Sequence, residues 1–249
     1  MPRYRFGVEY HGAAFAGWQL QDGPVTAQGV LEKALETILR GPTRIHGAGR
    51  TDSGVHASGQ VAHFDAPGEI DPRRVQFSLN ALAGPHVRVR GMERCDDAFH
   101  ARFDALSRRY VYRLALRPVA LGADLSWQPP WPFDTGLFLA ELRSALGRRD
   151  FLNFSVPRGD GKSTECTLLI ADAARNGIFL DVTVAADRFL HKMVRSLVGA
   201  SLDVARGAHP PGLVKAILEG RFAGERFWAP PQGLCLVKVE YPDGYDPGP

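Results

Sequence analysis

The strongest constraint on the fold is the order of strand and helix patterns, which runs β-α-β-β-α-β through the first half of the chain. Residues 3–10 alternate apolar and polar side chains, the period-two pattern of a half-buried strand. Residues 26–40 carry apolar side chains at helical spacing and stop at Gly41 and Pro42. The other elements predicted here are strands at 43–48, 59–65 and 86–93 and a helix that Asp71 caps and Gly84 ends.

The second half shows nearly the same order of patterns. An aromatic and β-branched strand at 108–116 is followed by a helix that Asp134 caps and Gly147 ends. Asn176-Gly177 is a strong hairpin signal. The remaining predicted elements are strands at 166–174, 178–185 and 234–242, a helix at 189–205 and an extra helix at 211–219.

These two series predict an α+β fold made of two tandem ferredoxin-like (β-α-β-β-α-β) halves, whose mostly antiparallel sheets join around a central active-site cleft. We predict an N-terminal half at 1–105 and a C-terminal half at 106–242. The polar, Pro- and Gly-rich residues 243–249 predict a flexible tail.

Composition narrows the class of protein. Lys and Arg number 30 against 27 Asp and Glu, so the net charge of +3 permits RNA binding without requiring it. Cys95, Cys166 and Cys235 are odd in number and far apart, which argues against a disulfide framework. The N-terminus alternates and no apolar run approaches the ~18 residues of a membrane span, so we expect a cytoplasmic protein without membrane contact.

One loop between two predicted strands carries the most distinctive chemistry. The string GRTDSGVHA, residues 49–57, places the single carboxylate of Asp52 beside Arg50, between glycines that permit unusual backbone angles. An isolated G-x-T-D-x-G segment is most often a structural turn. The full string, followed by SGQVAHF, closely resembles the signature of the tRNA pseudouridine synthase A family, in which the motif aspartate is the essential catalytic residue.

Three further segments strengthen this resemblance, in the family's order and over nearly the whole chain. FHARFDALSRRYVYRL, from Phe99, is similar to the second motif and gives Tyr110 the place of the active-site tyrosine. FLHKMVRSLVG, from Phe189, is similar to the third, and Arg195 matches the basic residue that pairs with the catalytic aspartate. APPQGLCLV, from Ala229, is similar to the closing motif, which implies that Leu234 packs near the base.

The resemblance implies an isomerase that converts uridine to pseudouridine in the anticodon stem-loop of tRNA, at positions 38, 39 and 40. The reaction needs no cofactor, because it breaks the N1–C1′ bond and forms a C5–C1′ bond without redox change. The nucleophile Asp52 could add to C6 of the base or attack C1′, and the sequence leaves both open. The implied partners are tRNA and a second copy of the chain, in a homodimer.

Several basic residues are candidates for substrate contacts. The resemblance implies that Arg50 enters the gap left by an extruded base, while Tyr110 suits stacking on that base. Residue type makes four others candidates for the RNA backbone: Arg102, Arg108, Arg109 and Lys192. The chain departs from the family at 162–167, where many relatives carry an arginine in place of Cys166.

Two other functions fit parts of the same pattern. A non-catalytic RNA-binding or tRNA-folding module on this scaffold would not need Asp52. A glycosidase-like hydrolase would need a second carboxylate, for which Asp65 and Asp104 are candidates. The intervals between His46, His56 and His63 match no usual zinc pattern, so we expect no metal.

Overall fold

The computed structural model describes residues 1–156, 163–225 and 227–248. The chain divides into two compact units, one of Met1–Arg108 with Cys235–Pro249 and one of Arg109–Leu234. The closing strand, which the sequence assigns to the second half, is therefore grouped with the first unit. None of the helices in the described ranges has the length and apolar character needed to cross a membrane.

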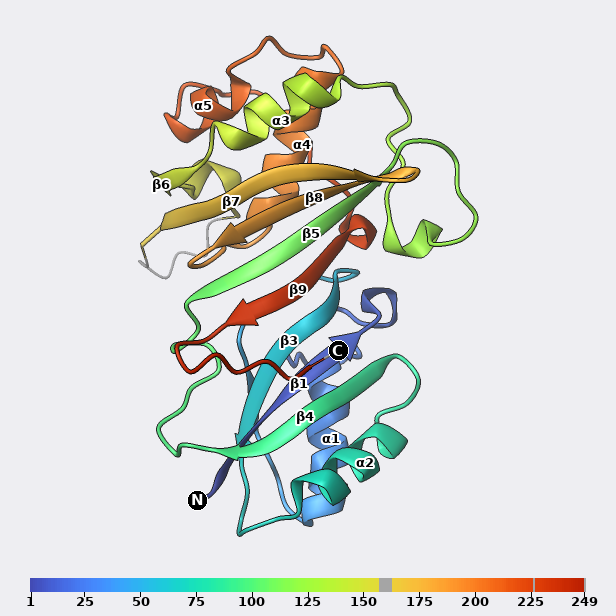
Figure 1. The fold of residues 1–249 in the computed structure, drawn as a ribbon, viewed down its shortest axis with the longest axis vertical. Coiled ribbons are helices and arrows are strands. Elements are labelled where there is room, and N and C mark those ends of the chain that lie inside the picture. Colours follow the sequence, from blue (N-terminus) through green and yellow to red (C-terminus); the bar gives the residue numbers. More distant parts are fainter. Residues whose placement is uncertain (157–162, 226, 249) are drawn as a thin grey trace. The chain divides into compact units, whose positions relative to one another are not determined.

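The first unit is built on an antiparallel sheet (Figure 1). In this sheet β1 lies between β4 and β3, and β2 pairs with β3. A fifth strand, β9, runs parallel to β3, with His56 opposite Cys235. The strands are β1 (Arg3–Tyr10), β2 (Ile45–Gly47), β3 (His56–Asp65), β4 (Val87–Cys95) and β9 (Leu234–Glu240).

Two helices, α1 (Ala27–Leu39) and α2 (Pro72–Leu82), pack beside this sheet (Figure 1). Both begin where the sequence predicts, because Thr26 accepts a hydrogen bond from the Gly29 amide and Asp71 accepts from the amides of the first turn of α2. Their apolar faces and the sheet bury a common core, which includes Tyr4, Phe6, Leu31, Leu35, Phe64, Val75 and Leu79.

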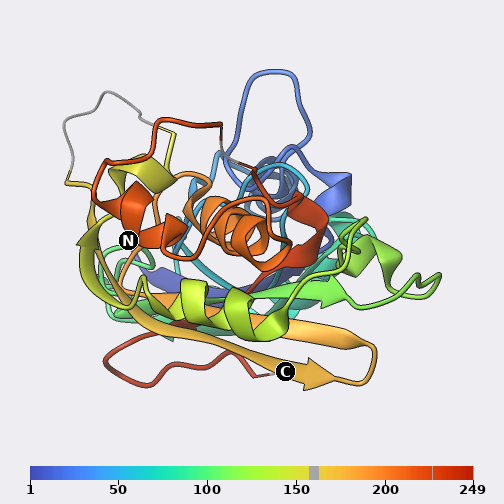
Figure 2. The same ribbon diagram turned by 90° about the horizontal axis from the view of Figure 1, so that it is seen from above.

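The second unit has a sheet with the order β5-β8-β7-β6, and α3 lies along β7 and packs against α4 (Figure 2). The hairpin predicted at Asn176-Gly177 is confirmed, since β7 ends at Asn176 and Gly177 has a φ of 61°. Its elements are β5 (Ser107–Ala115), α3 (Thr135–Arg143), β6 (Gly147–Asp150), β7 (Glu165–Asn176), β8 (Phe179–Ala186), α4 (Met193–Ala205) and α5 (Leu213–Leu218). Short 3-10 turns lie at Gly12–Ala14, Ala123–Leu125, Leu152–Phe154 and Pro231–Gly233.

The α+β class is confirmed, with differences in detail. The sequence extends α3 to Gly147, but the helix ends at Arg143 and Gly147, with a φ of 91°, begins the unpredicted β6. The predicted helix at 189–205 begins only at Met193, because Lys192 has a left-handed φ of 64°. In the segment predicted as a tail, Tyr245 is buried and its hydroxyl donates to the Gly91 carbonyl at 2.9 Å.

Candidate active site

The loop that carries Asp52 is fixed by the residues on either side of it. The hydroxyls of Thr51 and Tyr10 are 2.7 Å apart in the core. The Thr51 carbonyl accepts from the Trp18 amide at 3.2 Å, and the Asp52 carbonyl accepts from the Val55 amide at 3.1 Å. Asp52 itself is half-buried. The structure therefore holds the backbone under this carboxylate on both sides.

Contacts from Gln60 and Gly17 also hold the backbone of this loop. The Gln60 amide group brackets Gly49, donating to its carbonyl at 2.8 Å and accepting from its N–H at 3.3 Å. Gly17 has a φ of 97°, and a Cβ at this position would lie 2.6 Å from the Thr51 carbonyl oxygen. Only glycine fits that position. Arg50, directly before Thr51, has an exposed side chain.

The histidine of the same motif has a structural role. His56 is buried, and its Nδ1 accepts a hydrogen bond from the Gly12 amide at 3.0 Å. Because Nδ1 is an acceptor, the neutral ring carries its proton on Nε2. This contact anchors the end of the loop to the segment after β1.

In the second unit, Tyr110 lies on β5 with its side chain 7% exposed. Its ring meets the ring of Phe189 edge to face, with centroids 5.2 Å apart and planes at 90°. Such a contact fixes the orientation of the phenol ring. The two motifs that contribute these residues, one running into β5 and one leading into α4, are thus joined by a direct contact within this unit.

Arg195 lies on α4 and is bonded to the first residue of the closing motif. Its Nε donates to the Ala229 carbonyl at 2.7 Å, and the Ala229 amide donates back to the Arg195 carbonyl at 3.1 Å. Lys192, just before α4, places its ammonium 4.2 Å from the centre of the Trp228 ring. Trp228 is not among the residues predicted from the sequence, although its position directly before the closing motif is a usable signal.

The closing motif is held against β5 by Tyr112. The Tyr112 hydroxyl donates to the Pro230 carbonyl at 2.8 Å, and a Cβ on Gly233 would lie 2.7 Å from the tyrosine ring. Burial raises the pKa of Tyr112, an effect that the charge of Arg195 opposes. Leu234 follows directly, with 5% of its side chain exposed.

Comparison with known proteins places these residues in a family. A family model for tRNA pseudouridine synthase matches residues 7–104 and 142–242. The tRNA pseudouridine synthase A of Nitrobacter hamburgensis is 42% identical over 97% of this chain and 100% of its own length. That of Paramagnetospirillum magneticum is 40% identical over 97% and 96%. The chain belongs to the tRNA pseudouridine synthase A family.

The family match covers six of the predicted site residues: Arg50, Asp52, Arg102, Lys192, Arg195 and Leu234. Tyr110, Arg108 and Arg109 lie outside the matched ranges. The crystal structure of a Cbf5-Nop10-Gar1 complex aligns with 94% of this chain and 49% of its own, at 12% identity and a TM-score of 0.33, which is too low to support an argument.

Arg108, a candidate RNA contact in this family member, is turned into the first unit. It is 9% exposed, and its guanidinium donates to the carbonyls of Ala48 at 3.0 Å, Ala105 at 3.0 Å and Arg102. Ala48 directly precedes the Asp52 loop. This geometry favours a role for Arg108 in supporting that loop, while the Arg109 side chain is half-buried and that of Arg102 is exposed.

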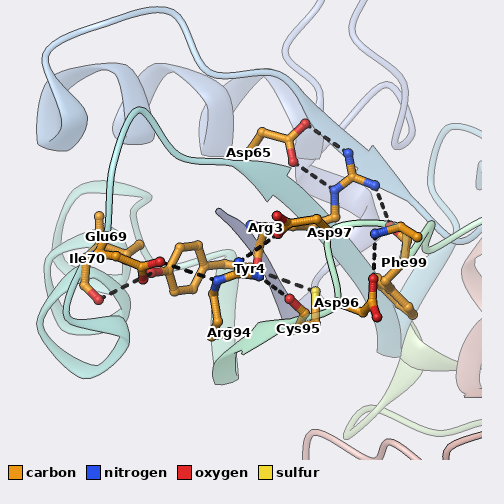
Figure 3. A network of polar contacts seen from close by, with 11 residues as sticks. Arg3, Tyr4, Asp65, Glu69, Ile70, Arg94, Cys95, Asp96, Asp97 and Phe99 are labelled. Atoms are coloured by element: carbon orange, nitrogen blue, oxygen red, sulfur yellow. Dashed lines mark hydrogen bonds and ion pairs between the residues drawn. The ribbon is translucent and has the colours of Figure 1, made fainter. Parts of the chain in front are cut away.

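Asp65, a carboxylate that a hydrolase would need, belongs to a network of ion pairs in the first unit (Figure 3). Arg3 binds it through Nε at 2.7 Å and Nη2 at 2.9 Å. This pairing lowers the pKa of Asp65. The other candidate, Asp104, accepts from the His100 amide at 2.8 Å. An acid catalyst must hold its proton near neutral pH, so Asp65 does not suit that role.

Three histidine rings form a cluster in the first unit. The rings of His46, His63 and His100 lie with centroids 4.8–5.5 Å apart. Burial, with the nearby positive groups, lowers the pKa of His63 to about 3. In the part of the chain that the structure describes, no group of three or more His, Cys, Asp or Glu side chains could hold a metal ion.

Cys166, where the sequence departs from many relatives, is buried near the start of β7, opposite Arg149 of β6. Burial raises the pKa of its thiol to about 12. Lys162, at the start of the same segment, lies outside the described residues.

Proposed function

We propose that this tRNA pseudouridine synthase uses Asp52 as its nucleophile on uridines of the tRNA anticodon stem-loop, at positions 38, 39 and 40. Membership of the family gives the reaction: the enzyme is an isomerase that converts uridine in tRNA to pseudouridine. The observation that carries the assignment of Asp52 is the GRTDSGVHA loop, with one carboxylate on a backbone bound on both sides. A fixed nucleophile avoids the cost of ordering it during reaction.

Asp52 is the only acidic residue in this loop. The N1–C1′ bond breaks, the uracil turns and C5 bonds to C1′. C5 then loses its proton and N1 takes up a proton, so the product is an isomer of the substrate. The carboxylate forms the intermediate at C6 or at C1′ and is released when the product forms. Electrons and atoms balance without any cofactor.

Tyr110 and Arg195 complete the catalytic set that the family resemblance supports. The edge contact of Tyr110 with Phe189 leaves it suited to stack on a uracil that has left its own stack. Arg195 is proposed to pair with the catalytic aspartate, as the family resemblance implies, and its bond to Ala229 supports a fixed orientation of the guanidinium. Leu234 packs near the base.

Three further residues are proposed to bind the substrate directly: Arg50, Arg109 and Lys192. Arg50 has the exposed side chain expected of a residue that fills the gap left by the base. Lys192 has its ammonium over Trp228, which limits its freedom before it meets a phosphate. For Arg108, the three carbonyl contacts support an indirect contribution through the Asp52 loop.

We also propose that the two halves are ferredoxin-like and that the enzyme is a homodimer. The antiparallel order β4-β1-β3 with β2 on β3 supports a ferredoxin-like first half, and β5-β8-β7 supports a similar second half. We propose that the halves join around the active-site cleft. A cytoplasmic homodimer acting on tRNA follows from the family resemblance.

Tritium release from tRNA labelled at C5 of uridine tests the proposal, because C5 loses its hydrogen only when a new bond forms there. Wild type should release tritium, and Asp52→Ala should release none while binding tRNA within about tenfold of wild type, since phosphate contacts dominate affinity. Asp22→Ala, at an exposed acidic position in the same unit, is the matched control.

Two results would count against the assignment. Normal release by Asp52→Ala would remove Asp52 from the chemistry. Absence of release by wild type that still binds tRNA would favour the non-catalytic RNA-binding module instead.

A further inference from the structure

We propose that the outer face of α2, with Arg88 of β4, is a second tRNA-binding surface that takes an unpaired nucleotide. The outer-face surface is defined by Arg73, Phe77, Ala81 and Arg88, around an open hollow of about 480 Å³. This proposal rests on the proposed function in one respect: tRNA is taken as the polyanion that binds to the surface. None of the family motifs in the sequence includes these residues.

The helix geometry sets the apolar part of this surface. Val75 and Leu79 face the core, whereas Phe77 lies on the opposite side of α2 and is 78% exposed. Arg73 and Ala81 are four residues before and after Phe77, so the three side chains form one outer stripe. An aromatic ring left in water beside arginines is the arrangement that stacks on a base while the guanidinium binds its phosphate.

Three arginines on or beside this surface have no acidic partner in the described part of the chain. Five arginines of that unit pair with carboxylates: Arg3, Arg5, Arg44, Arg90 and Arg94. Across residues 1–156, 163–225 and 227–248, no carboxylate lies within ion-pair distance of Arg73, Arg74 or Arg88. The nearest acid in sequence, Asp71, directs its carboxylate to the amides of Arg73 and Arg74 as a helix cap. The surface therefore carries uncompensated positive charge.

The floor of the hollow is rigid. The Asn80 side chain donates to the Val89 carbonyl at 2.8 Å and accepts from the Val89 amide at 2.7 Å. Gln76 accepts from the Met92 amide at 2.9 Å. These amides satisfy backbone groups on the free edge of β4, next to α2 in Figure 1, and so close that edge to another strand. A bound nucleotide would meet a preformed surface.

An anionic partner fits this surface better than a second copy of the chain. In a two-fold contact the same patch meets itself, so Arg73, Arg74 and Arg88 would face their own counterparts. Like charges brought together oppose association. The phosphates of tRNA remove that repulsion and release counterions.

The test measures tRNA binding and steady-state tritium release with Phe77→Ala, Arg73→Ala and Arg88→Ala. Phe77→Ala should weaken tRNA binding about fivefold or more, and Phe77→Trp should restore it. Each arginine variant should lower the slope of log Kd against log salt by about 1. All should raise KM for tRNA and leave kcat at saturating tRNA unchanged. Arg44→Ala, which removes an exposed arginine already paired with Glu32, is the matched control and should leave the salt slope unchanged.

Three results would overturn the inference. Unchanged affinity and salt slope in all three variants would show that the surface does not meet RNA. If the variants, without tRNA, sedimented as a smaller species than wild type, the surface would be a contact with a second copy of the chain. A loss of kcat without a change in KM would indicate damage to the chemistry. Tritium release by wild type is recorded in the same series, so failure of the proposed isomerisation is distinguishable from failure of this surface.

Discussion

Replacing Gly199 with alanine tests whether the contact between α4 and the segment before the closing motif controls both stability and catalysis. Gly199 lies inside α4, one turn after Arg195. A Cβ at this position would lie 1.9 Å from the Phe227 carbonyl oxygen and 2.8 Å from its carbon. Both atoms belong to the backbone, so no side-chain rotation relieves the clash.

Two effects of opposite sign set the magnitude. Alanine in place of glycine inside a helix ordinarily stabilises by about 1 kcal/mol. Here the Phe227 carbonyl must retreat by more than 1 Å to reach an ordinary distance. Overpacking of this kind costs about 1–3 kcal/mol, and stretching the two hydrogen bonds between Arg195 and Ala229 adds about 0.5 kcal/mol each. We therefore expect a net loss of about 2 kcal/mol.

Catalysis should suffer more than stability. The retreating segment carries the Ala229 carbonyl that accepts from Arg195 Nε. Misplacing a positioned group by about 1 Å can reduce kcat about 100-fold. The measurements are thermal unfolding, with an expected fall of about 4–8 °C, and tritium release at saturating tRNA.

The matched control is Gly136→Ala in the first turn of α3. There, among the described residues, a Cβ meets no backbone atom outside its own helix and only the side-chain oxygen of Asp134 that caps the helix, at 3.1 Å. We expect unchanged or slightly higher stability and full activity. If Gly199→Ala also raised the melting temperature and kept kcat, the proposed coupling of α4 to the closing segment would be refuted.

Three further predictions concern buried polar groups and stability. Burial lowers the pKa of His63 from 6.5 to about 3, so between these pH values the unfolded chain binds a proton on this histidine and the folded chain does not. The free energy of unfolding should therefore fall by up to ~1.4 kcal/mol per pH unit as the pH drops below 6.5. Denaturant titrations at several pH values should show a weaker pH dependence for His63→Gln than for wild type. Glu141 is buried and accepts from the Gly212 amide at 2.5 Å and the Val214 amide at 3.0 Å, so Glu141→Ala should lose about 2–3 kcal/mol in urea unfolding, whereas Glu141→Gln should lose less. The Cys166 thiol, with a pKa of about 12, should resist iodoacetamide at pH 8 until the protein unfolds. Rapid labelling of Cys166 in the folded protein, detected by mass spectrometry, would contradict this.

The elements that the sequence predicts correctly depend on local interactions. Thr26 and Asp71 begin their helices because each side chain binds amides of its own first turn. The turn after Asn176 needs only a glycine that accepts a positive φ. Residues 3–10 alternate because one face of their strand is buried. Such elements are encoded within a few residues, so pattern alone locates them.

The elements that the sequence misses depend on distant partners. Residues 147–150 read GRRD and have no apolar alternation, yet they form β6 because β7 supplies the pairing edge. Tyr245 is buried because Tyr241 and the Gly91 carbonyl meet it from elsewhere in the fold. The helix pattern runs through Leu146, but the chain must turn at Gly147 to reach β6. Pairing across tens of residues overrides local preference in each case.

The arginines show why the candidate site is harder to predict than the fold. Arg108 stands in a family motif, yet it is buried with three backbone carbonyls as acceptors, whereas Arg73 lies outside every motif and is exposed. Residue type is identical in both, and only the surroundings differ. A phosphate could reach the Arg108 guanidinium only by displacing carbonyls that would then be buried without donors, at about 1–3 kcal/mol each. The same phosphate can bind Arg73 by displacing only the water molecules around its exposed guanidinium. Desolvation, which no motif records, therefore decides which arginines remain available for RNA.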